Sequence, residues 1–139
     1  MDGVRWTTEQ SWHVTLRFLG QADAGDAMAA LAALDGHRCE AVLGPAPRRL
    51  FRGVLGVPVR GLDELAAAVV DATAHVGVAP EGRPFRGHIT LARWRHGPAP
   101  SCGGRIEARW TVEAVALVES KTSSDGARYE TIARVPLPA

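Results

Sequence analysis

Two short segments of the same pattern contain the residue types that acid–base chemistry requires. They are His13-Val14-Thr15-Leu16 and His88-Ile89-Thr90-Leu91, and composition alone predicts far fewer than one copy of this motif in 139 residues. The unperturbed pKa of histidine is about 6.5, so near neutral pH one imidazole can accept a proton while another donates one. Threonine hydroxyls donate hydrogen bonds to phosphate oxygens. The two motifs together therefore indicate a site that acts on a phosphate group.

The spacing of histidine and threonine within each motif fits a β-strand. Residues i and i+2 of a strand project from one face, about 6.6–7 Å apart. Two such strands lying side by side would surround a small volume with two imidazoles and two hydroxyls. A single H-x-T is far more often part of an ordinary half-buried strand, so it is the repetition in matched contexts that favours a site.

Metal ligation is a weaker interpretation of the two histidines. They stand 75 residues apart, and no third carboxylate or thiolate lies at ligand spacing. The other histidines, His37, His75 and His96, lack such a context. Cys39 and Cys102 form neither a disulfide framework nor a zinc knuckle. We therefore expect no metal and no cofactor.

Composition indicates one globular domain over residues 1–139. The chain is 46% hydrophobic and 22% charged with a net charge of +1, which excludes a polycationic or an acidic disordered protein. No apolar run approaches the roughly 18 residues of a membrane helix, and the first residues resemble no signal peptide. We expect a cytoplasmic protein that does not enter a membrane.

Arginine dominates the basic residues and gathers in two stretches without acids. Of 16 basic residues only Lys121 is a lysine, a bias that a GC-rich genome would also produce. No acid stands between Glu40 and Asp63, where four arginines occur, or between Glu81 and Glu107, where five occur. Local cationic segments of this kind attract anionic partners such as nucleic acid.

Hydrophobic periodicity and turn residues predict an α+β fold. Pro58 within an expected strand favours an edge or a bulge there. The expected strands cover 12–19, 39–43, 54–60, 88–94, about 109–119 and 127–135, and the last two are joined by a hairpin turn at 120–126. The expected helices cover 24–35 and 62–76, with Asp23 as the N-cap of the first, and 44–53 is expected to be irregular.

The sequence around the motifs resembles the 2H phosphoesterase superfamily, in its LigT-like branch of RNA 2′,3′-cyclic phosphodiesterases, long labelled 2′-5′ RNA ligases. Residues 6–20 (WTTEQSWHVTLRFLG) and 83–93 (RPFRGHITLAR) are similar to the two motif blocks of the family. Residues 116–129 resemble its C-terminal hairpin, including the Ser and Tyr at Ser120 and Tyr129. The resemblance covers nearly the whole chain.

The resemblance implies a bilobal α+β fold, in which two mostly antiparallel sheets face a central cleft and helices lie outside. It implies metal-independent opening of RNA 2′,3′-cyclic phosphate ends to 2′-phosphates, with His13 as general acid and His88 as general base. The residues by themselves leave open which histidine is the acid. The resemblance further assigns substrate contacts to Thr15, Thr90 and Arg93 on the phosphate, and to Phe18 beside the terminal nucleoside.

Two departures from the family pattern stand out. The residue before the second motif is usually proline and here is Gly87, which we expect to loosen the approach to the strand. The usual first strand and helix of the family are absent before Trp6. Their loss would expose a sheet edge and apolar surface, so we expect low stability or a homodimer that covers this surface.

Two other functions remain open at the level of sequence. The same chemistry could act on small cyclic nucleotides or 2′-5′ oligonucleotides, and the two basic stretches favour an RNA strand over these. A non-catalytic RNA-binding module would leave both motif histidines idle, because such a module needs arginines and aromatics but no titrating imidazoles.

Overall fold

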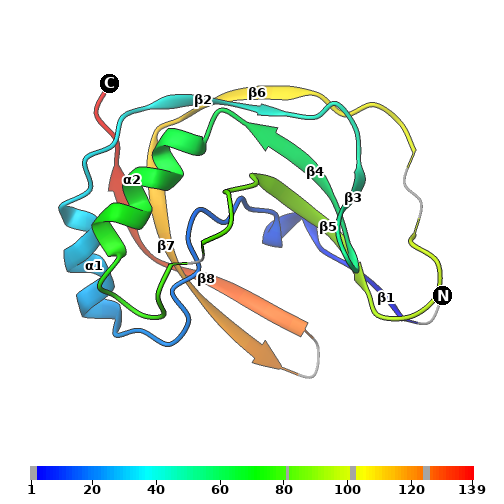
Figure 1. Cartoon of the computed structure of the whole chain (residues 1–139), viewed down its shortest axis with the longest axis horizontal. Helices are drawn as coiled ribbons and strands as arrows, with labels where there is room; N and C mark the ends of the chain where they lie inside the picture. Colours follow the sequence, from blue (N-terminus) through cyan, green and yellow to red (C-terminus); the bar gives the residue numbers. More distant parts are fainter. Residues whose placement is uncertain (1–2, 81, 101–102, 124–125) are drawn as a thin grey trace.

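The helices and strands of this computed structural model confirm the α+β class, with mostly antiparallel sheets (Figure 1). The structure describes residues 3–80, 82–100, 103–123 and 126–139. Cys102 and the tip of the expected 120–126 turn lie outside these residues. No helix in the described residues is long and apolar enough to cross a membrane.

A six-stranded antiparallel sheet forms the larger part of the fold. Its strands are β1 Val4–Trp6, β2 Cys39–Leu43, β3 Arg48–Phe51, β4 Val54–Arg60, β5 His88–Trp94 and β6 Ala108–Val112. They run in the order β1-β5-β4-β2-β6, with β3 paired to β4. The strand that contains the second motif, β5, therefore lies inside the sheet, between β1 and β4.

A separate two-stranded hairpin forms the second sheet. It consists of β7 Ala114–Ser123 and β8 Gly126–Pro136, which pair antiparallel from Ala114–Pro136 to Ser123–Gly126 with a register shift between Leu117 and Val118. Its base packs beside the helices, and its distal end extends away from them (Figure 1).

Two helices pack against each other and against the base of the hairpin. In α1 (Ala24–Ala32), the Asp23 side chain accepts a hydrogen bond from the Asp26 N–H at 3.0 Å, as expected for an N-cap. The second helix, α2 (Asp63–Thr73), has Asp63 and Glu64 in its first turn, where the helix dipole favours acids. The buried core between these elements contains Ala27, Ala30, Leu31, Leu65, Val69, Val76, Val115, Leu117 and Leu137.

A second core lies under the two motifs. Ala41, Val59 and Leu62 are buried there, and Val14 and Ile89 pack against them. The apolar residue in the middle of each H-x-T is thus anchored in the core, which leaves the flanking histidine and threonine on the opposite face.

The expected strand over 12–19 is wrong. Only Val14 of that range forms a β-bridge, to Ile89, and the segment before it contains a 3-10 turn, Glu9–Ser11. The first motif is therefore an irregular segment that joins the edge of β5 through a single bridge. It does not belong to a strand in a separate sheet.

Other boundaries also differ from those expected. The predicted strand 109–119 is two strands, because Glu113 separates β6, which pairs with β2, from β7, which pairs with β8. The range 44–53 contains β3, and β1 was not expected. Pro58 is wrongly predicted at an edge or a bulge: β4 is an inner strand, and the register shift of the β4–β5 pair falls between Leu55 and Gly56.

Candidate active site

The two H-x-T motifs meet at the bridge between Val14 and Ile89. The bridge is antiparallel, so the residue before Val14 lies opposite the residue after Ile89, and the reverse. His13 is therefore opposite Thr90, and Thr15 is opposite His88. Each histidine thus faces the threonine of the other motif, and the two histidines are diagonal neighbours, a relation that separates their backbones by about 7–8 Å. This register brings the residues of both motifs to one place on the sheet.

Each histidine ring is oriented by a hydrogen bond to the carbonyl oxygen two residues before it. The Nδ1 atom of His13 lies 2.7 Å from the Ser11 oxygen, and the Nδ1 atom of His88 lies 2.8 Å from the Arg86 oxygen. A carbonyl oxygen only accepts, so each Nδ1 carries the proton and donates it. In each neutral ring the Nε2 atom is therefore an unprotonated acceptor.

The two rings have different neighbours. His13 is exposed, its Nε2 lies 3.1 Å from the hydroxyl oxygen of Thr15, and its ring centroid lies 4.8 Å from that of Tyr129 on β8. His88 is half-buried, and its ring makes an edge contact with Phe51 on β3 at 5.2 Å. An aromatic side chain thus flanks each histidine.

Thr7 fastens the irregular first motif to β5. Its hydroxyl donates to the Thr90 oxygen at 2.8 Å and also lies 3.1 Å from the Leu91 oxygen. Its N–H donates to Leu91 at 2.9 Å, and its hydroxyl oxygen accepts from Nε1 of Trp12 at 3.0 Å. This residue, which sequence reasoning missed, holds the chain on both sides of the 3-10 turn against the second motif.

A bulge brings Arg93 to the face of the motif residues. Simple alternation along β5 would place Arg93 on the face opposite His88. The paired residues of β4 and β5 are Val54 with Arg93, Gly56 with Thr90 and Pro58 with His88. The three β4 residues occupy alternate positions and share one face, so their partners also share one face. The extra β5 residue, Leu91, produces this change, as bulges beside active sites do.

The described contacts of Phe18 and Arg17 are with residues other than the two histidines. Phe18 is 71% exposed and lies beside Gly20, and none of the described ring contacts of the two histidines involves it. In a strand over 12–19, Arg17 would share a face with His13 and Thr15. Its guanidinium instead donates to backbone oxygens at and beyond the end of α2: Thr73 at 3.2 Å, Val76 at 3.0 Å and Val78 at 2.9 Å.

The three histidines outside the motifs lie on the surface of the described residues. His37, His75 and His96 are exposed. The described part of the chain has no group of three histidines, cysteines or acids that is suited to hold a metal ion. Partial burial, and next the nearby Glu64, raise the pKa of the Cys39 thiol. The hydrogen bond and charge of Arg105 lower the pKa of the exposed Glu107 carboxyl.

Comparisons with known proteins fit this geometry. No protein-family model matches the chain. The RNA 2′,3′-cyclic phosphodiesterase of Geobacillus stearothermophilus is 35% identical over 150 aligned residues, covering 95% of this chain and 47% of that protein. The chain thus spans about half the length of this curated relative. Among crystal structures, TT0787 of Thermus thermophilus has a TM-score of 0.80 at 22% identity, covering 98% of this chain and 83% of that one.

The LigT protein of E. coli, in its apo form, matches with a TM-score of 0.76 at 26% identity, covering 99% of this chain and 83% of that one. Antiparallel sheets with two H-x-T motifs held against each other are shared with the LigT-like phosphoesterases, and the chain is similar to them over almost its whole length.

Proposed function

We propose that this chain hydrolyses the 2′,3′-cyclic phosphate at RNA ends to a 2′-phosphate, by acid–base catalysis between two histidines and without a metal. The observation that carries the proposal is the matched setting of His13 and His88. The Val14–Ile89 bridge holds the two motifs together, and the same hydrogen bond orients each ring. Two imidazoles on one face of a sheet suit a reaction that needs one proton removed and one supplied.

The reaction balances with these two groups. The neutral Nε2 of His88 takes a proton from water, the water oxygen bonds to phosphorus, and the bond from phosphorus to the 3′ oxygen breaks. The imidazolium of His13 gives its Nε2 proton to the leaving 3′ oxygen. The phosphate remains on the 2′ oxygen, and proton exchange with solvent restores both rings. The assignment of acid and base follows the family resemblance.

The hydroxyls of Thr15 and Thr90 and the guanidinium of Arg93 are proposed to hold the non-bridging phosphate oxygens. In the substrate-free geometry the Thr15 hydroxyl donates to the Nε2 atom of His13 at 3.1 Å, and it can turn from there to a phosphate oxygen. Donors placed in advance stabilise the negative charge that grows on these oxygens in the transition state. Phe18 stays a prediction as a wall beside the terminal nucleoside.

Relatives support the choice of substrate. The matched protein of Geobacillus stearothermophilus is named for RNA 2′,3′-cyclic phosphodiesterase activity, and E. coli LigT has been crystallised with 3′-AMP and with phosphate. The same site chemistry would also open a small cyclic nucleotide. A non-catalytic RNA-binding module would bind RNA ends with a 2′,3′-cyclic phosphate but would not hydrolyse them.

The test is an assay of an oligonucleotide with a 2′,3′-cyclic phosphate end, in the presence of EDTA. Wild type should turn it over, and His13→Ala and His88→Ala should each reduce kcat by about 10²–10⁴-fold, the usual contribution of a general acid or base. His75→Ala, on an exposed histidine outside the motifs, is the matched control and should keep full activity. Loss of wild-type activity with EDTA would overturn the metal-free mechanism, and full activity in either motif variant would overturn the two-histidine assignment.

The expected homodimer and the cytoplasmic location stay predictions. Size-exclusion chromatography at micromolar concentration should give a dimer. A thermally stable monomer would contradict this expectation.

A further inference from the structure

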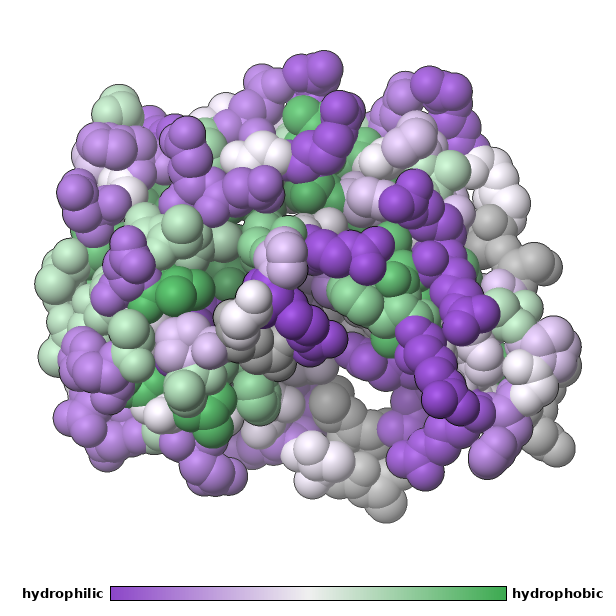
Figure 2. Space-filling model, viewed as in Figure 1, coloured by the Kyte–Doolittle hydropathy of each residue, from purple (hydrophilic) through white to green (hydrophobic). Residues whose placement is uncertain are grey.

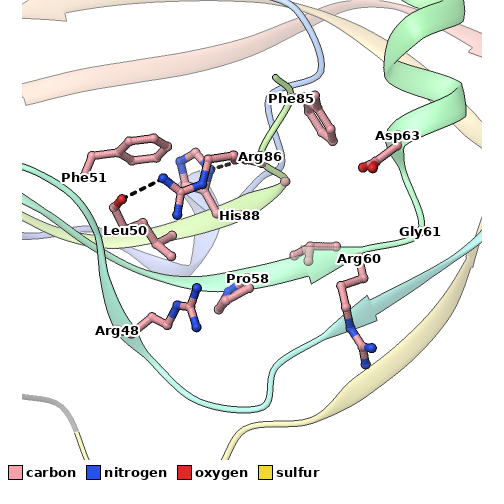
Figure 3. Close-up of a pocket in the computed structure, with 12 residues that line it drawn as sticks. Arg48, Leu50, Phe51, Pro58, Arg60, Gly61, Asp63, Phe85, Arg86 and His88 are labelled. Carbon is pink, nitrogen blue, oxygen red and sulfur yellow. Dashed lines mark hydrogen bonds between the residues drawn. The ribbon is translucent and has the colours of Figure 1, made fainter. Parts of the chain in front are cut away.

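A hollow of about 440 Å³ opens beside His88 (Figure 3). His13 approaches β5 from the N-terminal segment, whereas the hollow lies over β4 and β3, on the other side of β5. Its lining includes Arg48, Phe51, Asp63, Arg86 and His88. Hydrophilic side chains gather over the neighbouring β5 and β1, where the surface is hollowed (Figure 2).

The part of the hollow next to His88 is built by Arg86 and Phe51. The guanidinium of Arg86 lies 4.8 Å from the centroid of the Phe51 ring and donates to the Leu50 oxygen at 3.1 Å. The same Phe51 ring touches His88. The cation–π contact and the hydrogen bond hold the positive charge of Arg86 close to the proposed catalytic base, with only the Phe51 ring between them.

Arg48 adds a second positive charge on the same face. It pairs with Gly56, which pairs on its other side with Thr90, so Arg48 projects from the face of the motif residues. Its strand lies two strand spacings from β5, or about 10 Å. Figure 3 shows its side chain directed toward Pro58, which is the partner of His88. Arg48 therefore reaches back from β3 toward the catalytic pair.

The acid of the hollow lies at its other end. Asp63, at the start of α2, is drawn beside Phe85 and Gly61, away from Arg48 (Figure 3). Ion pairs within the described residues include Arg105 with Glu107 and Arg109 with Glu40, and none that joins two described residues involves Arg48 or Arg86. Two guanidiniums beside a phosphate site, with no carboxylate neutralising them there, are suited to bind a second phosphate group.

We propose that Arg48 and Arg86 bind the phosphodiester that joins the terminal nucleotide of the substrate to the nucleotide before it. This inference rests on the proposed function, because it takes the cyclic phosphate to lie between His13 and His88. It makes the hollow a specificity site: a dinucleotide end supplies this phosphodiester, and a cyclic mononucleotide does not.

The experiment compares three substrates: adenosine 2′,3′-cyclic phosphate, ApA ending in a 2′,3′-cyclic phosphate, and the same dinucleotide with a neutral methylphosphonate linkage. In wild type, kcat/KM for the charged dinucleotide should exceed that for the other two by about tenfold, as expected for a solvent-exposed hydrogen bond between charged groups. Arg48→Ala should remove most of this preference and leave the mononucleotide unchanged.

The matched control is Arg49→Ala. Arg49 is the next residue of the same strand, pairs with Leu55, and projects from the opposite face, so this variant removes the same charge without touching the hollow. It should keep the preference of wild type. Equal rates for the mononucleotide and the charged dinucleotide in wild type, or an equal loss on both in Arg48→Ala, would overturn the inference.

A binding measurement separates this inference from the proposed function. If wild type turns over none of the three substrates, the proposed function fails. Calorimetric titration with ApA 2′-phosphate and with adenosine 2′-phosphate then tests the hollow directly. Arg48→Ala should weaken binding of the dinucleotide about tenfold and leave the mononucleotide unchanged. Unchanged binding of the dinucleotide would refute the site.

Discussion

His13 and His88 form the same hydrogen bond in two unlike surroundings. Each donates from Nδ1 to the carbonyl oxygen two residues earlier, at 2.7 and 2.8 Å, although His13 lies in an irregular segment and His88 begins a strand. A backbone acceptor at this position fixes both the tautomer and the rotation of the ring. In the neutral form, both rings therefore have an unprotonated Nε2 atom.

The first prediction concerns the tautomers of these rings. In the neutral state, both should carry the proton on Nδ1, because the carbonyl oxygens accept only from a protonated nitrogen. Long-range ¹H–¹⁵N correlation spectra of the ¹⁵N-labelled protein above the titration range report the tautomer directly. His75 and His96, which are exposed, provide internal references in the same spectrum. An Nε2–H tautomer at His13 or His88 would contradict the assigned geometry.

The second prediction tests the face assigned to Arg93. Arg93→Ala should lower kcat/KM on a 2′,3′-cyclic phosphate by about tenfold or more, since a charge-assisted hydrogen bond to phosphate is lost from an exposed site. Arg95→Ala, an exposed arginine just past the end of β5, is the control and should change kcat/KM little. Equal effects of the two variants would mean that Arg93 acts only through net charge.

Local sequence patterns were sufficient to predict the strands that form the centre of the sheet. The ranges 39–43, 54–60 and 88–94 coincide with β2, β4 and β5. Each of these strands has a glycine directly at one end or at both, and all three contain β-branched residues, so propensity and turn signals agree with the tertiary structure. The two H-x-T motifs could also be recognised from the sequence, because the residue types and their spacing are local features.

Contacts between distant segments decided what the sequence did not predict. Polar and apolar residues alternate over 12–19, as in a strand. In the structure, however, Arg17 donates hydrogen bonds to backbone oxygens beyond α2, a distant contact that local alternation does not reveal. Phe51 and Tyr129 flank the histidines from other strands, and neither carries a local signal for that position. The orientation of Arg93 depends on one extra residue in a strand pair, which periodicity alone would assign to the opposite face.

The third prediction concerns Thr7, which fastens the first motif to β5. Thr7→Val removes the hydroxyl that donates to the Thr90 oxygen and accepts from the exposed indole of Trp12, so the free energy of unfolding should fall by about 0.5–1.5 kcal/mol. kcat should fall as well, because His13 depends on this attachment for its position. Thr7→Ser keeps the hydroxyl and should restore most of both. Chemical denaturation and single-turnover rates measure the two effects, and Thr7→Val with wild-type stability would contradict the role.

The fourth prediction concerns Gly87, the residue before the second motif. We expected glycine to loosen the chain here, but the Gly87 oxygen accepts a hydrogen bond from the Val59 N–H at 2.8 Å. A Cβ atom at this position would lie 2.5 Å from the Val59 oxygen and 3.3 Å from the Phe85 ring. Gly87 therefore permits a close approach of two backbones, directly beside His88.

Gly87→Ala must push β4 and the start of β5 apart, which should cost about 1–3 kcal/mol of stability, as overpacking does, and displace His88 from its partner oxygen. Gly82→Ala is the matched control, because a Cβ atom there meets nothing within 4 Å and its backbone does not need glycine. Thermal unfolding should show a lower Tm for the first variant only, with a reduced kcat at temperatures where it is folded. If Gly87→Ala were as stable and as active as Gly82→Ala, the close approach to Val59 would not be what positions the second histidine.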